Sequence, residues 1–97
     1  MAKLTTTYWR DIPAQVVASE RRKKAKVLLS NRFAEAIDKA AMRANMAGSD
    51  AYLEQWRKEI TKCSDDLELE VEKASKKLET DFSDERLALL VTNKGLI

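Results

Sequence analysis

The chain has 97 residues, a net charge of +2, one cysteine, two glycines, one proline and no histidine. Without histidine, neither a histidine-based catalytic triad nor a His/Cys zinc site can form, and two glycines are too few for a glycine-rich phosphate loop. We therefore expect a single small domain, 1–97, that is not an enzyme and needs no cofactor or metal. We also expect it to reside in the cytoplasm without a membrane segment, because no signal-peptide-like or bilayer-length apolar run occurs.

The N-terminal third of the chain has the composition of β-strands. Residues 3–29 are rich in β-branched and aromatic side chains, interrupted at 11–13 and again at 19–23. These side chains fit a pleated sheet, and the interruptions are too short for the crossovers that parallel strands need. The pattern predicts a three-stranded antiparallel meander.

A helical period follows the predicted meander. Apolar residues three and four positions apart predict one helix over 31–47, closed by Gly48 in the left-handed conformation. A second helix is expected over 49–61, begun by Ser49 or Asp50. Residues 65–94 predict one long helix or two consecutive ones, with the break at 83–84. The predicted fold class is therefore α+β, a three-stranded antiparallel β-meander followed by three to four α-helices.

Each predicted helix has an expected buried face. The second helix is expected to bury Tyr52, Leu53, Trp56 and Ile60. The first part of 65–94 repeats apolar residues at helical spacing, and these are Leu67, Val71, Ala74, Leu78 and Phe82. Its many carboxylates fall between these positions, which is typical of a solvated face. Cys63 has no histidine partner, so we expect it to be a packing residue and not a nucleophile.

Charge is distributed unevenly along the chain. Residues 1–50 hold ten Lys/Arg and five Asp/Glu, whereas residues 51–97 hold eight and eleven, which gives +5 and −3. The densest basic run fills five of the six positions 21–26 with Arg21, Arg22, Lys23, Lys24 and Lys26. Such a run can bind phosphates, can attract an acidic partner, or can be a solvated hairpin that blocks edge-to-edge aggregation.

The most distinctive segment is Tyr8-Trp9-Arg10-Asp11-Ile12-Pro13-Ala14-Gln15-Val16. On a strand, Tyr8 and Arg10 point to one face and Trp9 and Asp11 to the other. A sheet covered by helices on one side buries only one of the two rings. An exposed ring beside Arg10 is typical of a protein interface; alternatively, Trp9 packs in the core and Tyr8 lies over neighbouring threonines.

This segment carries a resemblance to a known family. Together with Phe33, 36–38, 40–43, 50–53 and 56–57, it resembles a small bacterial "virulence factor" family, over about residues 5–60. The resemblance implies a module that stands alone or precedes HEAT-like repeats, with no assigned reaction. It also implies, as one alternative, an accessory role in folate- and corrinoid-dependent methyl transfer. Where relatives tend to have glycine, this chain has Ser19-Glu20-Arg21, which favours a longer polar loop over a tight two-residue hairpin.

These observations favour a binding function over catalysis. We expect a non-enzymatic accessory or regulatory module that docks a protein partner through its sheet, with Tyr8, Trp9, Arg10, Asp11 and Gln15 as the contact residues. Self-association through the sheet, giving a homodimer, is a variant of this expectation. The alternative is nucleic-acid binding through the basic hairpin, residues 21–26, with Tyr8 and Trp9 as stacking surfaces.

Overall fold

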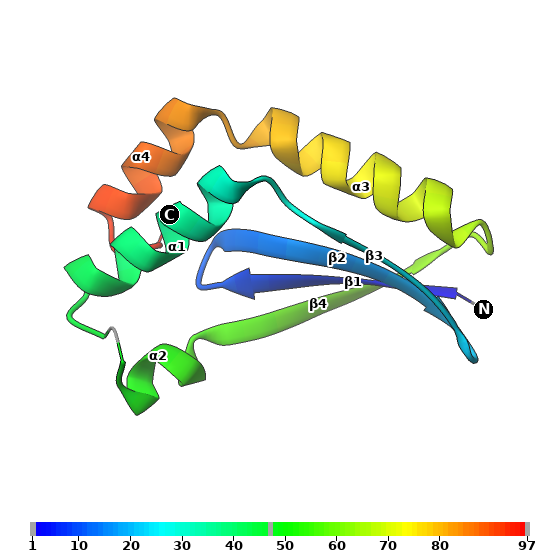
Figure 1. Ribbon diagram of the computed structural model, residues 1–97, viewed down its shortest axis with the longest axis horizontal. Coiled ribbons are helices and arrows are strands. Elements are labelled where there is room, and N and C mark those ends of the chain that lie inside the picture. The colour runs from blue at the N-terminus through cyan, green and yellow to red at the C-terminus, as the bar shows by residue number, and fades with distance from the viewer. Residues whose placement is uncertain (1, 47, 97) are drawn as a thin grey trace.

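In the part of the chain that the structure describes, four strands and four helices make up the fold (Figure 1). The computed structural model describes residues 2–46 and 48–96. In chain order the elements are β1 (Ala2–Trp9), β2 (Ile12–Glu20), β3 (Lys23–Leu28), α1 (Asn31–Arg43), α2 (Asp50–Glu54), β4 (Trp56–Cys63), α3 (Leu67–Asp81) and α4 (Asp84–Thr92). The predicted α+β class and the antiparallel meander are confirmed, and the sheet has one strand more than predicted.

The sheet has the strand order β3-β2-β1-β4, and every neighbouring pair is antiparallel. Two tight turns connect the meander. Trp9 pairs with Ile12 and Glu20 pairs with Lys23, so each turn contains two residues. The longer polar loop predicted after β2 is therefore wrong. Arg21 enters the tight turn by adopting φ 53°, in the left-handed region that glycine occupies at lower energy.

The predicted helix over 49–61 is also wrong. Helix α2 ends at Glu54, and Trp56–Cys63 form β4, paired with β1 along its full length. The expected burial of Leu53 and Ile60 fails with the helix, since both are more than 60% exposed. Pairing with the threonine-rich β1 supplies eight residues with a sheet partner, and this long-range interaction overrides a weak local helical period.

The other helix boundaries follow the sequence more closely. Helix α1 ends at Arg43, and Asn45 has the left-handed conformation just after it. Gly48, predicted to close this helix, also has a left-handed φ but lies further along, in the turn before α2. Ala47, the last residue of the predicted helix, lies outside the described residues. The segment 65–94 forms two helices. The break occurs because Ser83 caps α4, its Oγ accepting a hydrogen bond from the amide of Arg86 at 3.2 Å.

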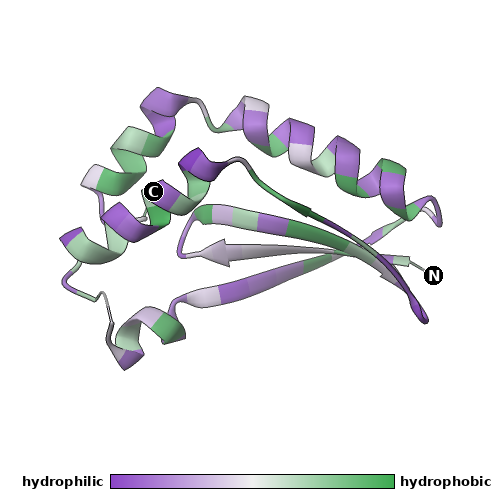
Figure 2. Ribbon diagram, viewed as in Figure 1, coloured by the Kyte–Doolittle hydropathy of each residue, from purple (hydrophilic) through white to green (hydrophobic). Residues whose placement is uncertain are grey.

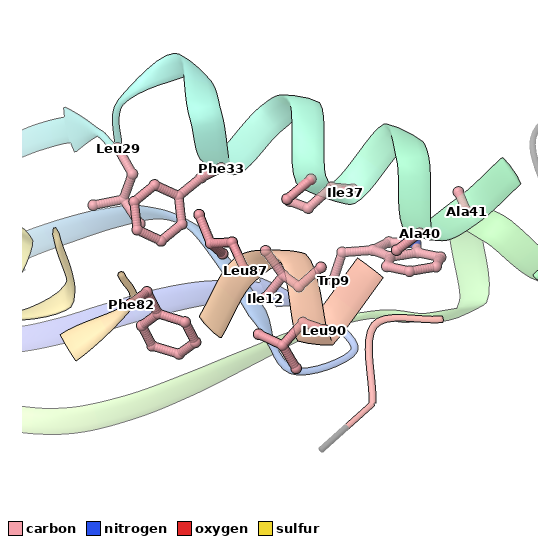
Figure 3. Packing of buried hydrophobic residues seen from close by; sticks show 11 residues of the cluster. Trp9, Ile12, Leu29, Phe33, Ile37, Ala40, Ala41, Phe82, Leu87 and Leu90 are labelled. Atoms are coloured by element: carbon pink, nitrogen blue, oxygen red, sulfur yellow. The ribbon is translucent and has the colours of Figure 1, made fainter. Parts of the chain in front are cut away.

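The larger core lies at the end of the sheet where the β1–β2 turn meets α1 and α4 (Figures 1 and 3). Trp9 and Ile12 at this turn are fully buried, and Phe33 of α1 packs edge-on against Phe82 with the ring centroids 6.0 Å apart. The remaining buried members come from α1, α4 and the end of β3, and they are Leu29, Ala36, Ile37, Ala40, Ala41, Leu87 and Leu90.

A second, smaller core lies under α3. This helix packs against β2 and β3 and only marginally against β1. Its buried face confirms the predicted stripe, since Leu67 and Val71 are buried against Ala2, Val16 and Ala18 of the sheet. Because α3 covers the β2–β3 half of this sheet face, it leaves β4 beside it without a helical cover.

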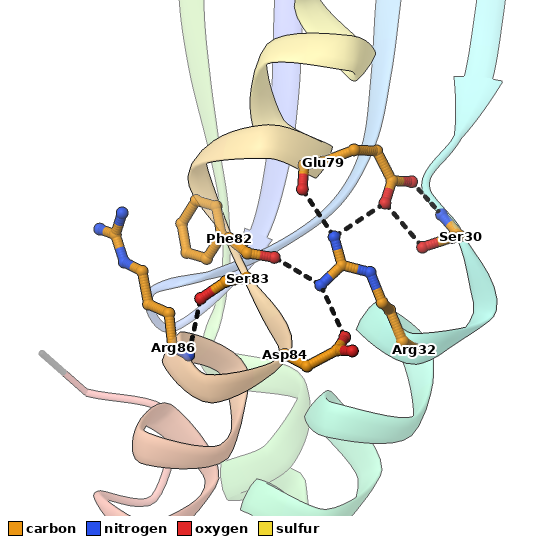
Figure 4. Close-up of polar contacts among 7 residues, drawn as sticks. All are labelled: Ser30, Arg32, Glu79, Phe82, Ser83, Asp84 and Arg86. Carbon is orange, nitrogen blue, oxygen red and sulfur yellow. Dashed lines mark hydrogen bonds and ion pairs between the residues drawn. The ribbon is translucent and has the colours of Figure 1, made fainter.

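Arg32 ties the start of α1 to the junction of α3 and α4 (Figure 4). Its guanidinium donates to the Glu79 carbonyl oxygen at 2.7 Å and to Glu79 Oε1 at 3.0 Å, and it also binds the carbonyl of Phe82 and the carboxylate of Asp84. The Glu79 carboxylate in turn accepts hydrogen bonds from the Ser30 amide at 2.7 Å and the Ser30 hydroxyl at 2.8 Å. This network joins the start of α1 to the end of α3 and the start of α4.

Glu79→Gln is expected to destabilise the fold in a pH-dependent way. Partial burial raises the pKa of the Glu79 carboxyl, but the hydrogen bonds from Ser30 and Arg32 outweigh it and hold that pKa below its ordinary value. A carboxylate with a lowered folded-state pKa stabilises the protein above the unfolded-state pKa of about 4.3, and this contribution is lost as the pH falls through the folded-state pKa. We expect Glu79→Gln to lose about 1–2 kcal/mol at neutral pH and the difference from the wild type to close in acid.

Urea denaturation at neutral and acidic pH measures this effect. Glu72→Gln on the same helix is the matched control, because Glu72 is solvent-exposed and its carboxylate bonds Lys76 across one helical turn. It should change stability far less. An equal loss for the two variants would contradict the role assigned to the Arg32–Glu79 network.

Candidate functional site

The distinctive segment contributes to two different parts of the structure. Trp9 is fully buried, its indole Nε1 donates to the carbonyl of Tyr52 at 3.0 Å, and its ring lies 5.6 Å from the Tyr52 ring. Because Trp9 is fully buried, a partner cannot contact its side chain in this structure, contrary to the expectation that it is a contact residue. Of the two rings in the segment, the core takes Trp9 and leaves Tyr8 at the surface of the sheet.

Arg10 also has a structural role. With φ 53°, it forms the β1–β2 turn, and its guanidinium donates to Gln55 Oε1 at 3.2 Å, to the carbonyl of Lys94 at 2.8 Å and to Met46 Sδ at 3.3 Å. These three acceptors come from segments far apart in the sequence. Arg10 thus holds the C-terminal segment and the α1–α2 and α2–β4 connections around the turn, and little of it is free for a partner.

Tyr8 and Asp11 meet two residues of β4 on the face of the sheet that carries α3. The guanidinium of Arg57 lies over the Tyr8 ring, 4.5 Å from its centroid. It also donates to Asp11 Oδ1 at 3.2 Å and to the carbonyl of Arg10 at 3.0 Å, and it forms an ion pair with Glu59. The cluster joins two residues of the distinctive segment to a strand that sequence reasoning assigned to a helix.

This cluster forms one wall of a groove of about 450 Å³ between β4 and α3. Apolar side chains from Ala74, Leu78 and Phe82 line the helical side. Charged side chains of both signs stand around it, and these are Asp11, Arg57, Glu59, Lys77, Asp81 and Arg86. An apolar lining with balanced charges around it suits a polypeptide better than a strongly charged ligand.

Tyr8 in the groove and Cys63 at the end of β4 both have a raised pKa. Burial, followed by the negative charge of Glu59, raises the pKa of the Tyr8 hydroxyl, so this group stays protonated at neutral pH. Burial and three nearby carboxylates likewise raise the pKa of the Cys63 thiol at the end of β4, which disfavours the nucleophilic thiolate. Across residues 2–46 and 48–96, no group of three His, Cys, Asp or Glu side chains is placed to hold a metal ion.

The outer edge of β4 borders the same groove. In the described part of the chain β4 pairs with β1 on one side and with no strand on the other. The amide of Arg10 donates to the carbonyl of Gln55, the residue opposite it, so these two form a hydrogen-bonded pair. Hydrogen-bonded and non-hydrogen-bonded pairs alternate along antiparallel strands, so the pairs at Arg57, Glu59 and Thr61 bond to β1 and those at Lys58, Ile60 and Lys62 do not. It follows that the amide and carbonyl groups of Lys58, Ile60 and Lys62 point away from β1, toward the open edge.

The remaining predicted contact residues lie elsewhere. Gln15 is on the opposite face of the sheet, beside Leu28 and Trp56, and the structure does not bring it together with Tyr8 and Asp11. The basic run is divided as well. Arg21 and Arg22 form the hairpin tip, Lys23 pairs with Glu20 on the α3 side, and Lys24 and Lys26 alternate onto the opposite face.

Sequence reasoning missed Arg57 and Glu59 because it placed them in a helix. The local signal is weak: the β-branched pair Ile60 and Thr61 favours a strand, but the charged residues at 57, 58, 59 and 62 show no period of two.

Comparison with known proteins gives one match. A family model described as "Virulence factor" matches residues 7–91, from the last three residues of β1 to the last turn of α4. Neither the curated proteins nor the solved structures give a significant match. In the part of the chain that the structure describes, no helix is both long and apolar enough to cross a membrane.

Proposed function

The chain belongs to the virulence factor family, and from this premise and the geometry of β4 we propose that it is a non-enzymatic docking module that binds an extended segment of a partner protein. The observation that carries the proposal is the open edge of β4 beside a groove that contains Tyr8 and Asp11. A long unpaired edge is the surface to which another chain adds a strand.

Strand addition accounts for the arrangement of groups at this edge. The partner backbone would bond to the outward amides and carbonyls of Lys58, Ile60 and Lys62. Alternate partner side chains would then point into the groove, toward Arg57, Glu59 and the apolar side of α3. Backbone bonds supply affinity in this binding mode, and the groove supplies specificity.

The charges along β4 indicate which partner fits. The side chains of Lys58, Ile60 and Lys62 share one face of the strand. Two copies of β4 paired antiparallel with Ile60 opposite Ile60 would place Lys58 of each copy opposite Lys62 of the other, and like charges in directly opposed positions are destabilising. A heterologous partner strand with acidic residues flanking an apolar one avoids this repulsion, so we favour it over a homodimer.

Ile60→Pro is expected to weaken partner binding at least tenfold while the domain stays folded. Proline removes an amide that points away from β1, and edge strands tolerate proline at such positions. Tenfold corresponds to about 1.4 kcal/mol, close to the net value of one backbone hydrogen bond together with its shape fit. Peptides selected from a random library on the wild-type protein provide the ligand, and their Kd is compared by fluorescence anisotropy.

Ile60→Ala is the matched control, because it truncates the same side chain and keeps the outward amide. Ile60→Ala should change the Kd much less than Ile60→Pro does, whereas Tyr8→Ala should weaken the binding of peptides whose side chains enter the groove. Circular dichroism verifies that each variant is folded. The proposal fails if folded Ile60→Pro binds the selected peptides as well as the wild type does, or if the wild type is dimeric at all concentrations and selects no peptide.

A further inference from the structure

The opposite face of the sheet carries a concentration of positive charge. The strand registers place three rows of side chains on this face: Leu28, Gln15, Thr7 and Lys58; then Lys26, Val17, Thr5 and Ile60; then Lys24, Ser19, Lys3 and Lys62. These rows contain five lysines and no carboxylate. Asp38 of α1 lies beyond the first row, where it lines a pocket with Gln15 and Leu28.

This face is open to solvent over the two rows that lie away from α1. Helix α3 packs on the other side of the sheet, and α1 and α2 reach only the end of it near the β1–β2 turn (Figure 1). All five lysines are exposed, and none forms an ion pair within the described part of the chain. The fold thus sets these charges together without neutralising them, and β4 is largely hydrophilic along its length (Figure 2).

We propose that this open sheet face binds single-stranded nucleic acid. A strand that crosses the sheet from β4 to β3 would pass Lys62, Lys3 and Lys24 in one row. The outer lysines of that row are three strand spacings apart, about 14 Å, so their ammonium groups can bind different phosphates of one crossing strand. The hairpin tip, Arg21 and Arg22, is exposed next to Lys24 and extends the positive surface.

The uncharged part of the face favours a single strand over a duplex. Leu28 and Ile60 are 67% and 61% exposed, and Trp56 is half-buried at the end of the face. Exposed apolar and aromatic side chains contact the faces of unstacked bases, which a continuous duplex keeps stacked inside. Thr5 and Ser19 between the lysines add hydroxyl groups that can bond base edges or sugars.

Binding is measured by fluorescence anisotropy with labelled single-stranded RNA and DNA of about 12 nucleotides, a length within the range of single-strand sites. If each of the five lysines binds one phosphate, three in the row of Lys62, Lys3 and Lys24 and two in the rows beside it, the slope of log K against log salt between about 50 and 200 mM should be near −3.5. Lys24→Gln/Lys26→Gln should weaken binding and reduce the magnitude of that slope by about 1.4, because two of the contacts are lost.

The matched control is Lys73→Gln/Lys76→Gln, which removes the same charge from α3 on the other side of the sheet, where both side chains are exposed. It should leave affinity and slope nearly unchanged. The proposal is overturned if no binding occurs at about 50 mM salt, or if the control pair weakens binding as much as the Lys24/Lys26 pair does. It is also overturned if a duplex of the same sequence binds more tightly than the single strand, or if polyglutamate with the same number of charges displaces the bound strand.

Discussion

Trp9→Ala is expected to lower the free energy of unfolding by about 3–5 kcal/mol, the usual range for removing a fully buried aromatic side chain. Trp9 is fully buried at the point where the β1–β2 turn meets α1 and α4, and its indole N–H bonds the carbonyl of Tyr52. Alanine would leave a cavity among four segments and an unpaired carbonyl. Since small domains have a total stability of about 5–15 kcal/mol, this variant should be close to unfolded at physiological temperature.

Chemical denaturation of Trp9→Ala, Trp9→Phe and Trp56→Ala measures this contribution. Trp9→Phe keeps a ring but loses the hydrogen bond, so a loss of about 1–2 kcal/mol is expected. Trp56 is only half-buried, so Trp56→Ala should lower the free energy of unfolding less than Trp9→Ala does. A loss no larger for Trp9→Ala than for Trp56→Ala would contradict the placement of Trp9 in the core.

Gly95→Ala is expected to destabilise the protein by about 2–5 kcal/mol. Gly95 has φ 87°, which is unfavourable for alanine by about 1–2 kcal/mol. A Cβ added there would lie 2.8 Å from Cζ3 and 3.2 Å from Cε3 of Trp9, and such overpacking typically adds about 1–3 kcal/mol. The position is also fixed from both sides, since the Gly95 carbonyl accepts from the Asp11 amide at 2.8 Å and its amide donates to Leu90 at 2.6 Å.

Gly48→Ala is the matched control for Gly95→Ala. Gly48 has φ 75°, but a Cβ added to it would meet no atom within 4 Å. It should therefore show the conformational penalty alone, about 1–2 kcal/mol. In a Trp9→Phe background, which lacks the clashing Cζ3 and Cε3 atoms, Gly95→Ala should become less destabilising. Strict additivity of the two substitutions would mean that the residues do not interact.

The parts of the fold that the sequence predicts are those determined by neighbouring residues. The β-branched and aromatic residues over 4–9 and the apolar runs that follow predict the meander. The helical period from Leu67 to Phe82 predicts α3 with the correct buried face. The Ser83 cap also marks the start of α4. In each case the local preference and the tertiary packing agree, so a local pattern is sufficient.

The parts that sequence reasoning missed depend on contacts between distant segments. β4 exists because 56–63 find β1 as a partner, more than 40 residues earlier in the chain. The tight turns place Arg10 and Arg21 in a conformation that their own preferences disfavour, and Arg10 is held there by bonds to Gln55 and Lys94. The groove was missed for the same reason, because Arg57 and Glu59 of β4 form part of its wall.

The most direct test of docking along β4 is amide hydrogen exchange by NMR, with and without a selected peptide. The account predicts that the amides of Lys58, Ile60 and Lys62 exchange fast in the free protein and become protected on binding. The amides of Arg57, Glu59 and Thr61 already bond β1 and should change little. Protection confined to α1, to the basic hairpin or to no part of β4 would contradict it.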